Sequence, residues 1–132
     1  MSDESDVLAA HDAFYAAFAS GDLEAMEDIW SKTAEVACCH PGWEPLQGRA
    51  QVMASFQAII GNGAPPVRSS DARCHLISGV AWVICTETLP SGKLAATNLF
   101  VRENGRYRLV LHHAGPIATR PTQPKPPSTV MN

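Results

Sequence analysis

Histidines at two places in this sequence could exchange protons near neutral pH. His40 begins the segment "HPGW", at which a short strand-like segment ends. His112 and His113 are adjacent in "LVLHHAGP". An unperturbed imidazole titrates at about pH 6.5, so His40 and His113 could act as general acids or bases. Two structural alternatives stay open: His40 as a turn residue bonded to the backbone, and His113 as a satisfied histidine in a half-buried strand.

Metal binding is the rival use of histidines and cysteines. Adjacent His112 and His113 point to opposite faces of a strand, as do Cys38 and Cys39, so neither pair can easily share one ion. The four cysteines form no CxxC pair, which favours buried, reduced thiols, with a reactive thiol at Cys38 or Cys39 as the alternative. No phosphate-binding loop, nucleophile elbow or zinc-protease motif is present. We therefore expect neither a metal nor a tightly held cofactor.

The composition limits the class of protein and its partners. The 132 residues suit one domain, predicted at 1–116, and the proline-rich residues 117–132 are expected to be a flexible tail. The formal net charge is -3 and no basic stripe is present, so we expect neither nucleic acid nor a membrane as partner. The beginning "MSDESDVLAA" is acidic and lacks a long apolar run, which predicts a cytoplasmic protein.

The elements that must position these residues follow from the hydrophobic spacing. Helical periodicity covers residues 5–19, a second helix begins after Asp22 as N-cap, and a third covers 48–60. A short strand at 35–39 precedes the third helix. The alternation further along the chain predicts strands near 67–77, 80–89, 93–102 and 106–114.

The Asn104-Gly105 dipeptide predicts a tight hairpin turn and, with it, a strand register. The predicted pairs are Phe100 with Leu109, Asn98 with Leu111 and Ala96 with His113. This register places His113 on the same face as Asn98 and assigns His112 to the opposite, outer face.

Both faces of the predicted hairpin are substantially apolar, although a sheet with one buried face should alternate cleanly. Three helices can cover only one face. We therefore expect a homodimer that covers the outer face of the sheet with a second copy of the chain.

The order helix, helix, strand, helix and four strands resembles the nuclear transport factor 2-like superfamily. The segments "FYAAFASGDLEAMEDIWSKTAEVACCHPGWEPLQGR" and "TNLFVRENGRYRLVLHHAGP" resemble its SnoaL-like and ketosteroid-isomerase-like branches, especially a subgroup with an HPGW segment and a His-rich last strand. The resemblance covers residues 5–116. It implies an α+β, cystatin-like cone: three N-terminal helices packed on a curved, mostly antiparallel sheet, with an apolar pocket open at one end.

The resemblance also places the catalytic groups of the ketosteroid isomerases on this chain. Their first-helix tyrosine falls on Phe14, their Asp-Pro step on His40-Pro41, and the acid of their third strand on Asn98. All three groups are replaced, which argues against steroid isomerisation.

The sequence therefore predicts a pocket for a small hydrophobic molecule. The candidate catalytic residues are His40 for proton transfer, with Asn98 and His113 to polarise or orient a carbonyl or hydroxyl group. The candidate ligand-binding residues are Phe14, Tyr15, Trp43, Trp82, Glu87 and Phe100. A cofactor-independent isomerase, cyclase or dehydratase is the first hypothesis. The alternative is a non-catalytic, dimeric ligand-binding or association domain.

Overall fold

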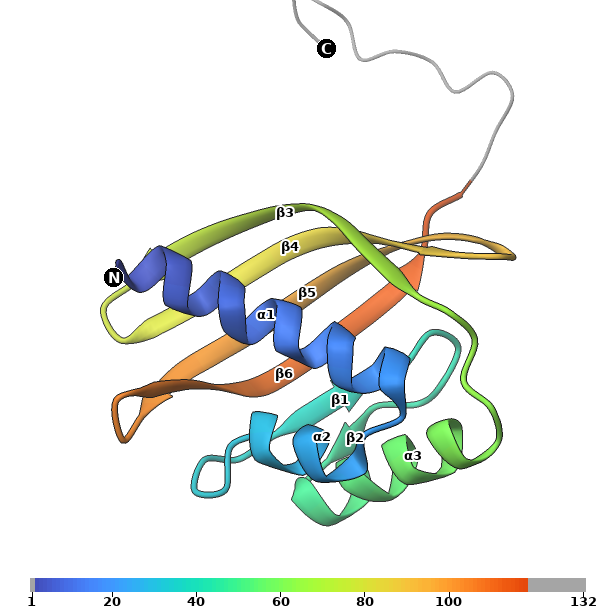
Figure 1. Ribbon diagram of the computed structural model, residues 1–132, viewed down its shortest axis with the longest axis horizontal. Coiled ribbons are helices and arrows are strands. Elements are labelled where there is room, and N and C mark those ends of the chain that lie inside the picture. Colours follow the sequence, from blue (N-terminus) through green and yellow to red (C-terminus); the bar gives the residue numbers. More distant parts are fainter. Residues whose placement is uncertain (1, 119–132) are drawn as a thin grey trace, which may run out of the picture.

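The computed structural model describes residues 2–118 (Figure 1). Most of the predicted tail, residues 117–132, therefore lies outside the described residues. The helices are α1 (Asp3–Ser20), α2 (Leu23–Ile29) and α3 (Arg49–Gly61). The strands are β1 (Ala37–Cys39), β2 (Leu46–Gln47), β3 (Arg68–Ile77), β4 (Val80–Leu89), β5 (Gly92–Glu103) and β6 (Arg106–Pro116). The predicted α+β class is confirmed, and β2 is an addition to it.

Local capping explains where the first two helices begin. The Ser2 side chain accepts a hydrogen bond from the Ser5 N–H at 3.1 Å, and Asp22 accepts one from the Ala25 N–H at 3.0 Å. These bonds satisfy N–H groups that have no partner inside a helix. Within the described residues, no helix is long and apolar enough to cross a membrane.

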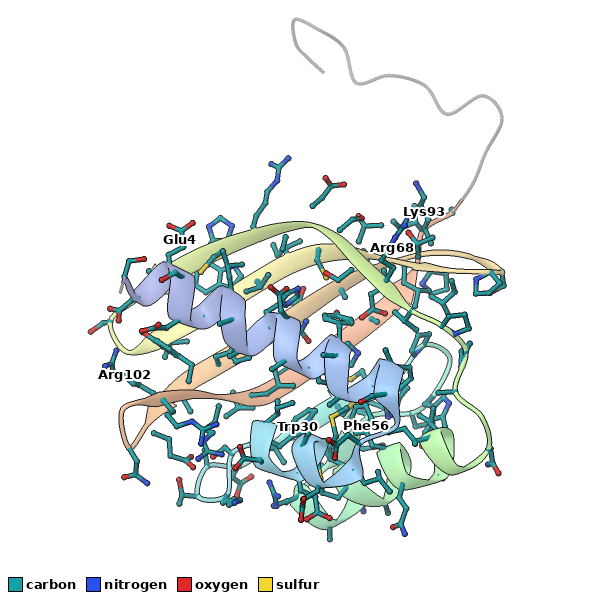
Figure 2. All side chains as sticks on the ribbon, in the orientation of Figure 1. Glu4, Trp30, Phe56, Arg68, Lys93 and Arg102 are labelled. Atoms are coloured by element: carbon teal, nitrogen blue, oxygen red, sulfur yellow. The ribbon has the colours of Figure 1, made fainter. Side chains whose placement is uncertain are left out.

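The six strands form one sheet in the order β2-β1-β6-β5-β4-β3, in which only β1 and β6 run parallel. α1 lies across one face of the sheet, and α2 and α3 lie beside β1 and β2 (Figure 1). Aromatic rings fill the space between the layers, as the full set of side chains shows (Figure 2). Phe14, Trp30 and Phe56 meet there, with ring centroids 5.8 to 6.5 Å apart. Phe100 is fully buried in this core.

β6 carries one residue more than its partner strand. Phe100 pairs with Leu109, as predicted, but Leu99 pairs with Leu111, so Val110 has no partner on β5. This is a β-bulge, and both Leu109 and Val110 are buried beside it. The predicted register is therefore right up to the bulge and wrong by one residue beyond it.

The bulge decides which histidine faces the helices. Asn98 pairs with His112, and Ala96 pairs with Ala114. Because a shift of one residue exchanges the two faces of a strand, His112 is buried on the helix-covered face and His113 is exposed on the outer face. The predictions that His113 shares a face with Asn98 and that His112 lies outside are wrong for this reason.

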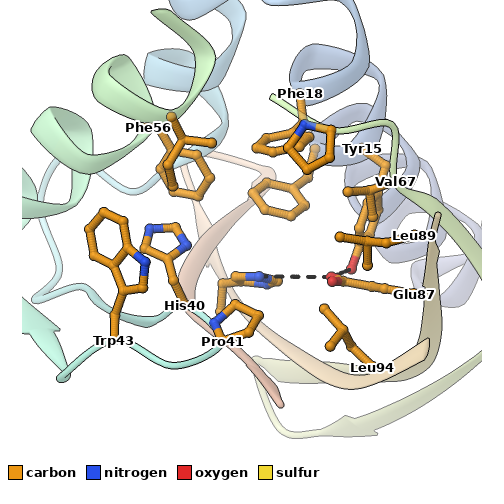
Figure 3. A pocket seen from close by; sticks show the side chains of 14 residues that line it. Tyr15, Phe18, His40, Pro41, Trp43, Phe56, Val67, Glu87, Leu89 and Leu94 are labelled. Carbon is orange, nitrogen blue, oxygen red and sulfur yellow. Dashed lines mark hydrogen bonds and ion pairs between the residues drawn. The ribbon is translucent and has the colours of Figure 1, made fainter. Parts of the chain in front are cut away.

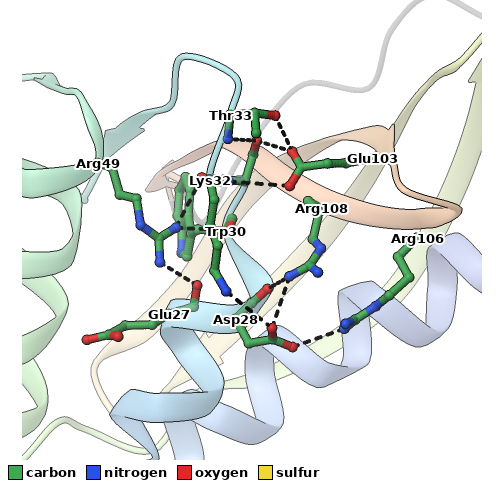
Figure 4. A network of polar contacts seen from close by, with 10 residues as sticks. Glu27, Asp28, Trp30, Lys32, Thr33, Arg49, Glu103, Arg106 and Arg108 are labelled. Carbon is green, nitrogen blue, oxygen red and sulfur yellow. Dashed lines mark hydrogen bonds and ion pairs between the residues drawn. The ribbon is translucent and has the colours of Figure 1, made fainter.

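A polar network ties the β5–β6 hairpin to the end of α2 (Figure 4). Asp28 accepts hydrogen bonds from Arg106 at 3.0 Å and Arg108 at 3.1 Å, and these guanidinium groups hold the pKa of its carboxyl below the usual value. Arg49 donates to the Glu27 and Trp30 carbonyl oxygens at 2.6 and 3.0 Å, which satisfies acceptors at the end of α2. The strand that carries His112 is thereby fixed against the helices.

The register predicts that substitutions at two adjacent positions lower the free energy of unfolding by different amounts. His112→Ala leaves the buried Oδ1 atom of Asn98 without its donor, which should lower the free energy of unfolding by about 1–3 kcal/mol. His113→Ala changes an exposed side chain and should stay within about 0.5 kcal/mol. Urea unfolding of both variants measures the difference. Equal costs, or a larger cost at His113, would contradict the bulge.

Candidate functional site

A cavity of about 220 Å³ opens between α1, α3, the loop after β1 and strands β4 to β6 (Figure 3). Most of its wall is apolar, and a carboxyl, a phenol and two imidazoles supply the polar part. The lining residues are Phe14, Tyr15, Phe18, His40, Pro41, Trp43, Phe56, Ile59, Pro65, Val67, Glu87, Leu89, Leu94 and His112.

The HPGW segment is a tight turn that presents two rings to this cavity. The Trp43 N–H donates to the His40 carbonyl at 3.0 Å, and Gly42 has φ +82°. Proline followed by a residue with positive φ is the pattern of a type II turn, which explains Pro41-Gly42. The turn folds Trp43 back over His40, with ring centroids 4.8 Å apart, while Trp43 itself stays 47% exposed at the rim.

His40 is a buried, neutral imidazole held from α3. Its Nε2 atom lies 2.8 Å from Ser55 Oγ, whose own hydrogen goes to the Val52 carbonyl at 2.7 Å. Ser55 therefore accepts, and His40 carries its proton on Nε2. Burial lowers the pKa of His40 to about 4, so it is uncharged at neutral pH.

The sulfur of Cys38 lies 3.6 Å from Nε2 and 3.8 Å from Nδ1 of His40, beside both ring nitrogens. Burial raises the pKa of the Cys38 thiol to about 12, with small contributions from Cys39 and Glu87. Cys38 is therefore a thiol and no nucleophile, because the thiolate is the reactive form.

Glu87 and Tyr15 form a buried pair on another part of the wall. The Tyr15 hydroxyl donates to Glu87 Oε2 at 2.6 Å, and Glu87 is only 4% exposed. Burial raises the pKa of the Glu87 carboxyl, and the hydrogen bond from Tyr15 lowers it by less. Burial, with the neighbouring carboxyl, also raises the pKa of Tyr15. The carboxyl is thus tuned toward its protonated form, the state of a general acid.

His112 stands next to this carboxyl. Its Nδ1 atom lies 2.6 Å from Asn98 Oδ1, so Nδ1 carries the proton, and its Nε2 atom lies 3.8 Å from Glu87 Oε2. Burial lowers the pKa of His112 to about 3, with smaller contributions from His40, His113 and His11. Because the imidazole is neutral, its contact with Glu87 is no ion pair. Nε2 keeps a free lone pair that faces the carboxyl and the cavity.

The structure brings together five of the predicted site residues: His40, Phe14, Tyr15, Trp43 and Glu87 all line the cavity. Four others lie elsewhere, each for a separate reason.

Asn98 lies behind the wall, bonded to Tyr15 and His112, and Phe100 belongs to the core. His113 is on the outer face. Trp82 is also outside, because its neighbours Ala81 and Val83 point inward, and its ring stacks on His75 at 5.2 Å.

Sequence analysis missed three residues of the site. His112 was assigned to the wrong face because the bulge left no mark in an apolar run. Ser55 and His11 occupy helix positions that any small or amphipathic residue could fill, so no local signal distinguished them. Among the described residues, no group of three histidine, cysteine or acidic side chains could hold a metal ion.

An α+β cone of three helices on a curved, mostly antiparallel sheet is the architecture of the nuclear transport factor 2-like proteins. A model of the SnoaL-like domain matches residues 7–119, and the chain belongs to this family.

Three relatives illustrate the range of the family. A candidate dehydratase of the nuclear transport factor 2-like family from Streptomyces avermitilis is 30% identical, with 89% of this chain and 97% of that one covered and a TM-score of 0.81. A candidate calcium/calmodulin-dependent protein kinase type II association domain from Thiobacillus denitrificans is 35% identical, with 83% and 94% covered and a TM-score of 0.74.

The F-box protein SKIP8 of Arabidopsis thaliana is 25% identical over 111 residues, which are 82% of this chain. The chain spans about half the length of that curated relative, 48% of it.

The pKa of His40 makes a prediction about stability. Between pH 6.5 and about 4 the unfolded chain binds a proton at His40 more readily than the folded chain, so this residue's contribution to stability is lost as the pH falls. Glu87, whose folded pKa is raised from 4.5, acts in the opposite direction above that pH. The diagnostic quantity is therefore the difference between wild type and His40→Gln.

Urea unfolding should show that this difference in the free energy of unfolding shrinks as the pH is lowered from neutral toward 4.5. Gln can still donate to Ser55, which limits other effects of the substitution. A difference that is constant, or that grows on acidification, would mean that His40 is not buried in its neutral form.

Proposed function

We propose that this SnoaL-like protein is a cofactor-independent enzyme that moves protons on a small, uncharged molecule, and that the reaction is the elimination of water from a hydroxy ketone or aldehyde. One observation carries the proposal: a carboxyl whose pKa burial raises and a neutral imidazole lie 3.8 Å apart on the wall of one apolar cavity. Such a pair supplies the acid and the base that an elimination needs.

The cavity favours an uncharged substrate. Among its described lining residues none is lysine or arginine, and its two imidazoles are neutral at pH 7. A carboxylate or phosphate would lose its hydration there without gaining a cation. The cavity of about 220 Å³ is also below the range of about 300–1,000 Å³ that drug-sized ligands occupy. The substrate class is therefore a compact, mostly apolar hydroxy carbonyl compound.

The two groups can complete a cycle without a further reactant. Nε2 of His112 accepts the proton from the carbon next to the carbonyl, and the electron pair of that bond becomes the new double bond. The hydroxyl on the following carbon leaves with the proton of Glu87, as water. The proton on His112 then passes to the Glu87 carboxylate, 3.8 Å away, through the water molecule just formed, which restores both groups.

Tyr15 supports this cycle by its hydrogen bond to Glu87 Oε2. Nε2 of His40 carries its proton and donates to Ser55, whereas Nε2 of His112 has a lone pair beside Glu87, so we assign the carbon-bound proton to His112. Proton transfer by His40 stays a prediction, which the variants below test. The candidate dehydratase from Streptomyces avermitilis, at 30% identity, supports the choice of reaction class.

The aldol adduct of benzaldehyde and acetone is a suitable test substrate, because its dehydration gives benzylideneacetone, which absorbs in the near ultraviolet. Wild type should accelerate this dehydration, and Glu87→Gln and His112→Asn should each lower kcat about 10²–10⁴-fold, the usual share of a general acid or base. His40→Asn should retain more activity than His112→Asn. If His40→Asn were instead the less active of the two variants, the role of base would belong to His40.

Charge selectivity supplies the control. Cinnamamide and cinnamate have nearly the same shape, and only the second is charged. Cinnamamide should inhibit the dehydration or bind in a calorimeter, whereas cinnamate should do neither at pH 7. Tight binding of the amide without any turnover of hydroxy ketones would favour a non-catalytic binding protein.

An association role is the second candidate, and the outer face of the sheet favours it. Trp82, Leu99 and Leu111 form a row of half-buried apolar side chains across three strands, and Ile84 beside them is 45% exposed. We propose that a second copy of the chain covers this outer face. The relative named as a kinase association domain, at 35% identity, supports assembly in general and specifies no partner for this chain.

Ile84→Glu should halve the molar mass measured by light scattering, because it buries a carboxylate in the proposed interface. Gln57→Glu adds the same charge on an exposed position of α3 and should leave the mass unchanged. A monomeric wild type would remove the dimer, and it would leave the pocket unaffected.

A further inference from the structure

Asn98 stands at the centre of a buried hydrogen-bond network, although the proposed reaction gives it no direct contact with a substrate. It lies in the middle of β5, is fully buried, and does not line the cavity. Its Oδ1 atom accepts from His112 Nδ1 at 2.6 Å, and its Nδ2 atom donates to the Tyr15 hydroxyl at 3.1 Å and to His11 Nδ1 at 3.3 Å. Both amide hydrogens are used by side chains of α1, and Oδ1 is used by a side chain of β6.

The direction of each bond in this network is determined by the next one. The Tyr15 hydroxyl has one hydrogen, and the Glu87 oxygen 2.6 Å away needs it. Tyr15 must therefore accept from Asn98, which assigns Nδ2 to that side of the amide and Oδ1 to the side of His112. With the opposite amide orientation, Glu87 Oε2 and Asn98 Oδ1 would compete for the single hydrogen of the Tyr15 hydroxyl.

Two imidazole tautomers follow from this orientation. His112 must carry its proton on Nδ1, because it faces the carbonyl oxygen of Asn98. His11 must accept at Nδ1 and carry its proton on Nε2, which lies 3.0 Å from the hydroxyl of Ser69. In free histidine the Nε2–H form predominates, so the protein holds His112 in the less common tautomer.

We propose that Asn98 is a positioning residue that fixes the Nδ1–H tautomer of His112 and, through Tyr15, the hydrogen of the Glu87 pair. The consequence is that the lone pair on His112 Nε2 faces Glu87 and the cavity. With the other tautomer, Nε2–H would point toward the Glu87 carboxyl, and the lone pair of His112 would face Asn98 instead of the cavity. The consequence for catalysis rests on the proposed function, whereas the tautomer itself does not.

Tautomers are read directly from nitrogen-15 NMR of histidine-labelled full-length protein, where protonated and unprotonated ring nitrogens have well-separated shifts. Wild type should show Nδ1–H for His112 and Nε2–H for His11. Asn98→Asp supplies only acceptors, so His112 should stay Nδ1–H while His11 changes to Nδ1–H. Asn98→Leu removes the acceptor, so His112 should change to Nε2–H.

Thr97→Val is the matched control, because Thr97 is the neighbouring position on β5, pairs with His113 and faces outward. It should change neither tautomer. Finding Nε2–H at His112 in wild type, or an unchanged His11 tautomer in Asn98→Asp, would overturn the assignment. These two measurements decide the matter even where Asn98→Leu does not fold.

The kinetic consequence is tested separately with the aldol adduct. Asn98→Leu should lower kcat about 10²–10⁴-fold with KM nearly unchanged, since it costs the whole contribution of the base. Asn98→Asp should retain more activity. The tautomers need no substrate, so an inactive wild type with the expected tautomers would refute only the proposed reaction. An active wild type with the wrong tautomer would refute the role of Asn98 and the assignment of the base to His112, and it would leave the reaction class unaffected.

Discussion

Desolvation of a few polar groups is the constraint on which this site depends. Glu87, His112 and His40 are each less than a tenth exposed, and a buried charge without a partner costs several kcal/mol. The protein meets this cost by keeping the imidazoles neutral and by connecting the polar atoms to one another through Asn98 and Tyr15. Neutral polar groups in such a space are poorly suited to binding ions, because no fixed charge offsets the lost hydration of the ion.

The geometry of the sheet brings the residues of that network together. The bulge at Val110 buries two consecutive side chains and turns His112 toward α1, where Tyr15 already faces the sheet. The HPGW turn brings His40 to the same cavity from the parallel strand β1. The network therefore joins the first helix, the middle of the sheet and the last strand. Its hydrogen bonds stabilise the fold as well as the site.

Local sequence signals predicted most of the fold correctly. The strand register beyond the bulge was predicted wrongly, because it depends on packing against distant helices. The Asn104-Gly105 turn and the pairing of Phe100 with Leu109 were correct because turn chemistry is local. The run of apolar residues around Val110 has no alternation that could reveal an extra residue, since the bulge is stabilised by burying side chains against distant helices. The predicted faces of His112 and His113 were exchanged for that reason, whereas the family resemblance implied both the pocket and the position of His40 beside it.

Enzymatic and association roles do not compete for the same residues in this fold. Along β4, Glu87 points to the cavity while Trp82 and Ile84 point outward, so one strand can serve a site on one face and a partner on the other. Relatives of similar identity that are named for the two roles are therefore compatible with one architecture. The inner polar cluster of Glu87, His112 and Asn98 favours the enzymatic role over the association role. A scaffold that only associates would be as stable, or more so, with apolar residues at Glu87 and His112. Keeping an acid, an imidazole and the amide that orients them in the same buried space is a cost that assembly does not require and proton transfer does.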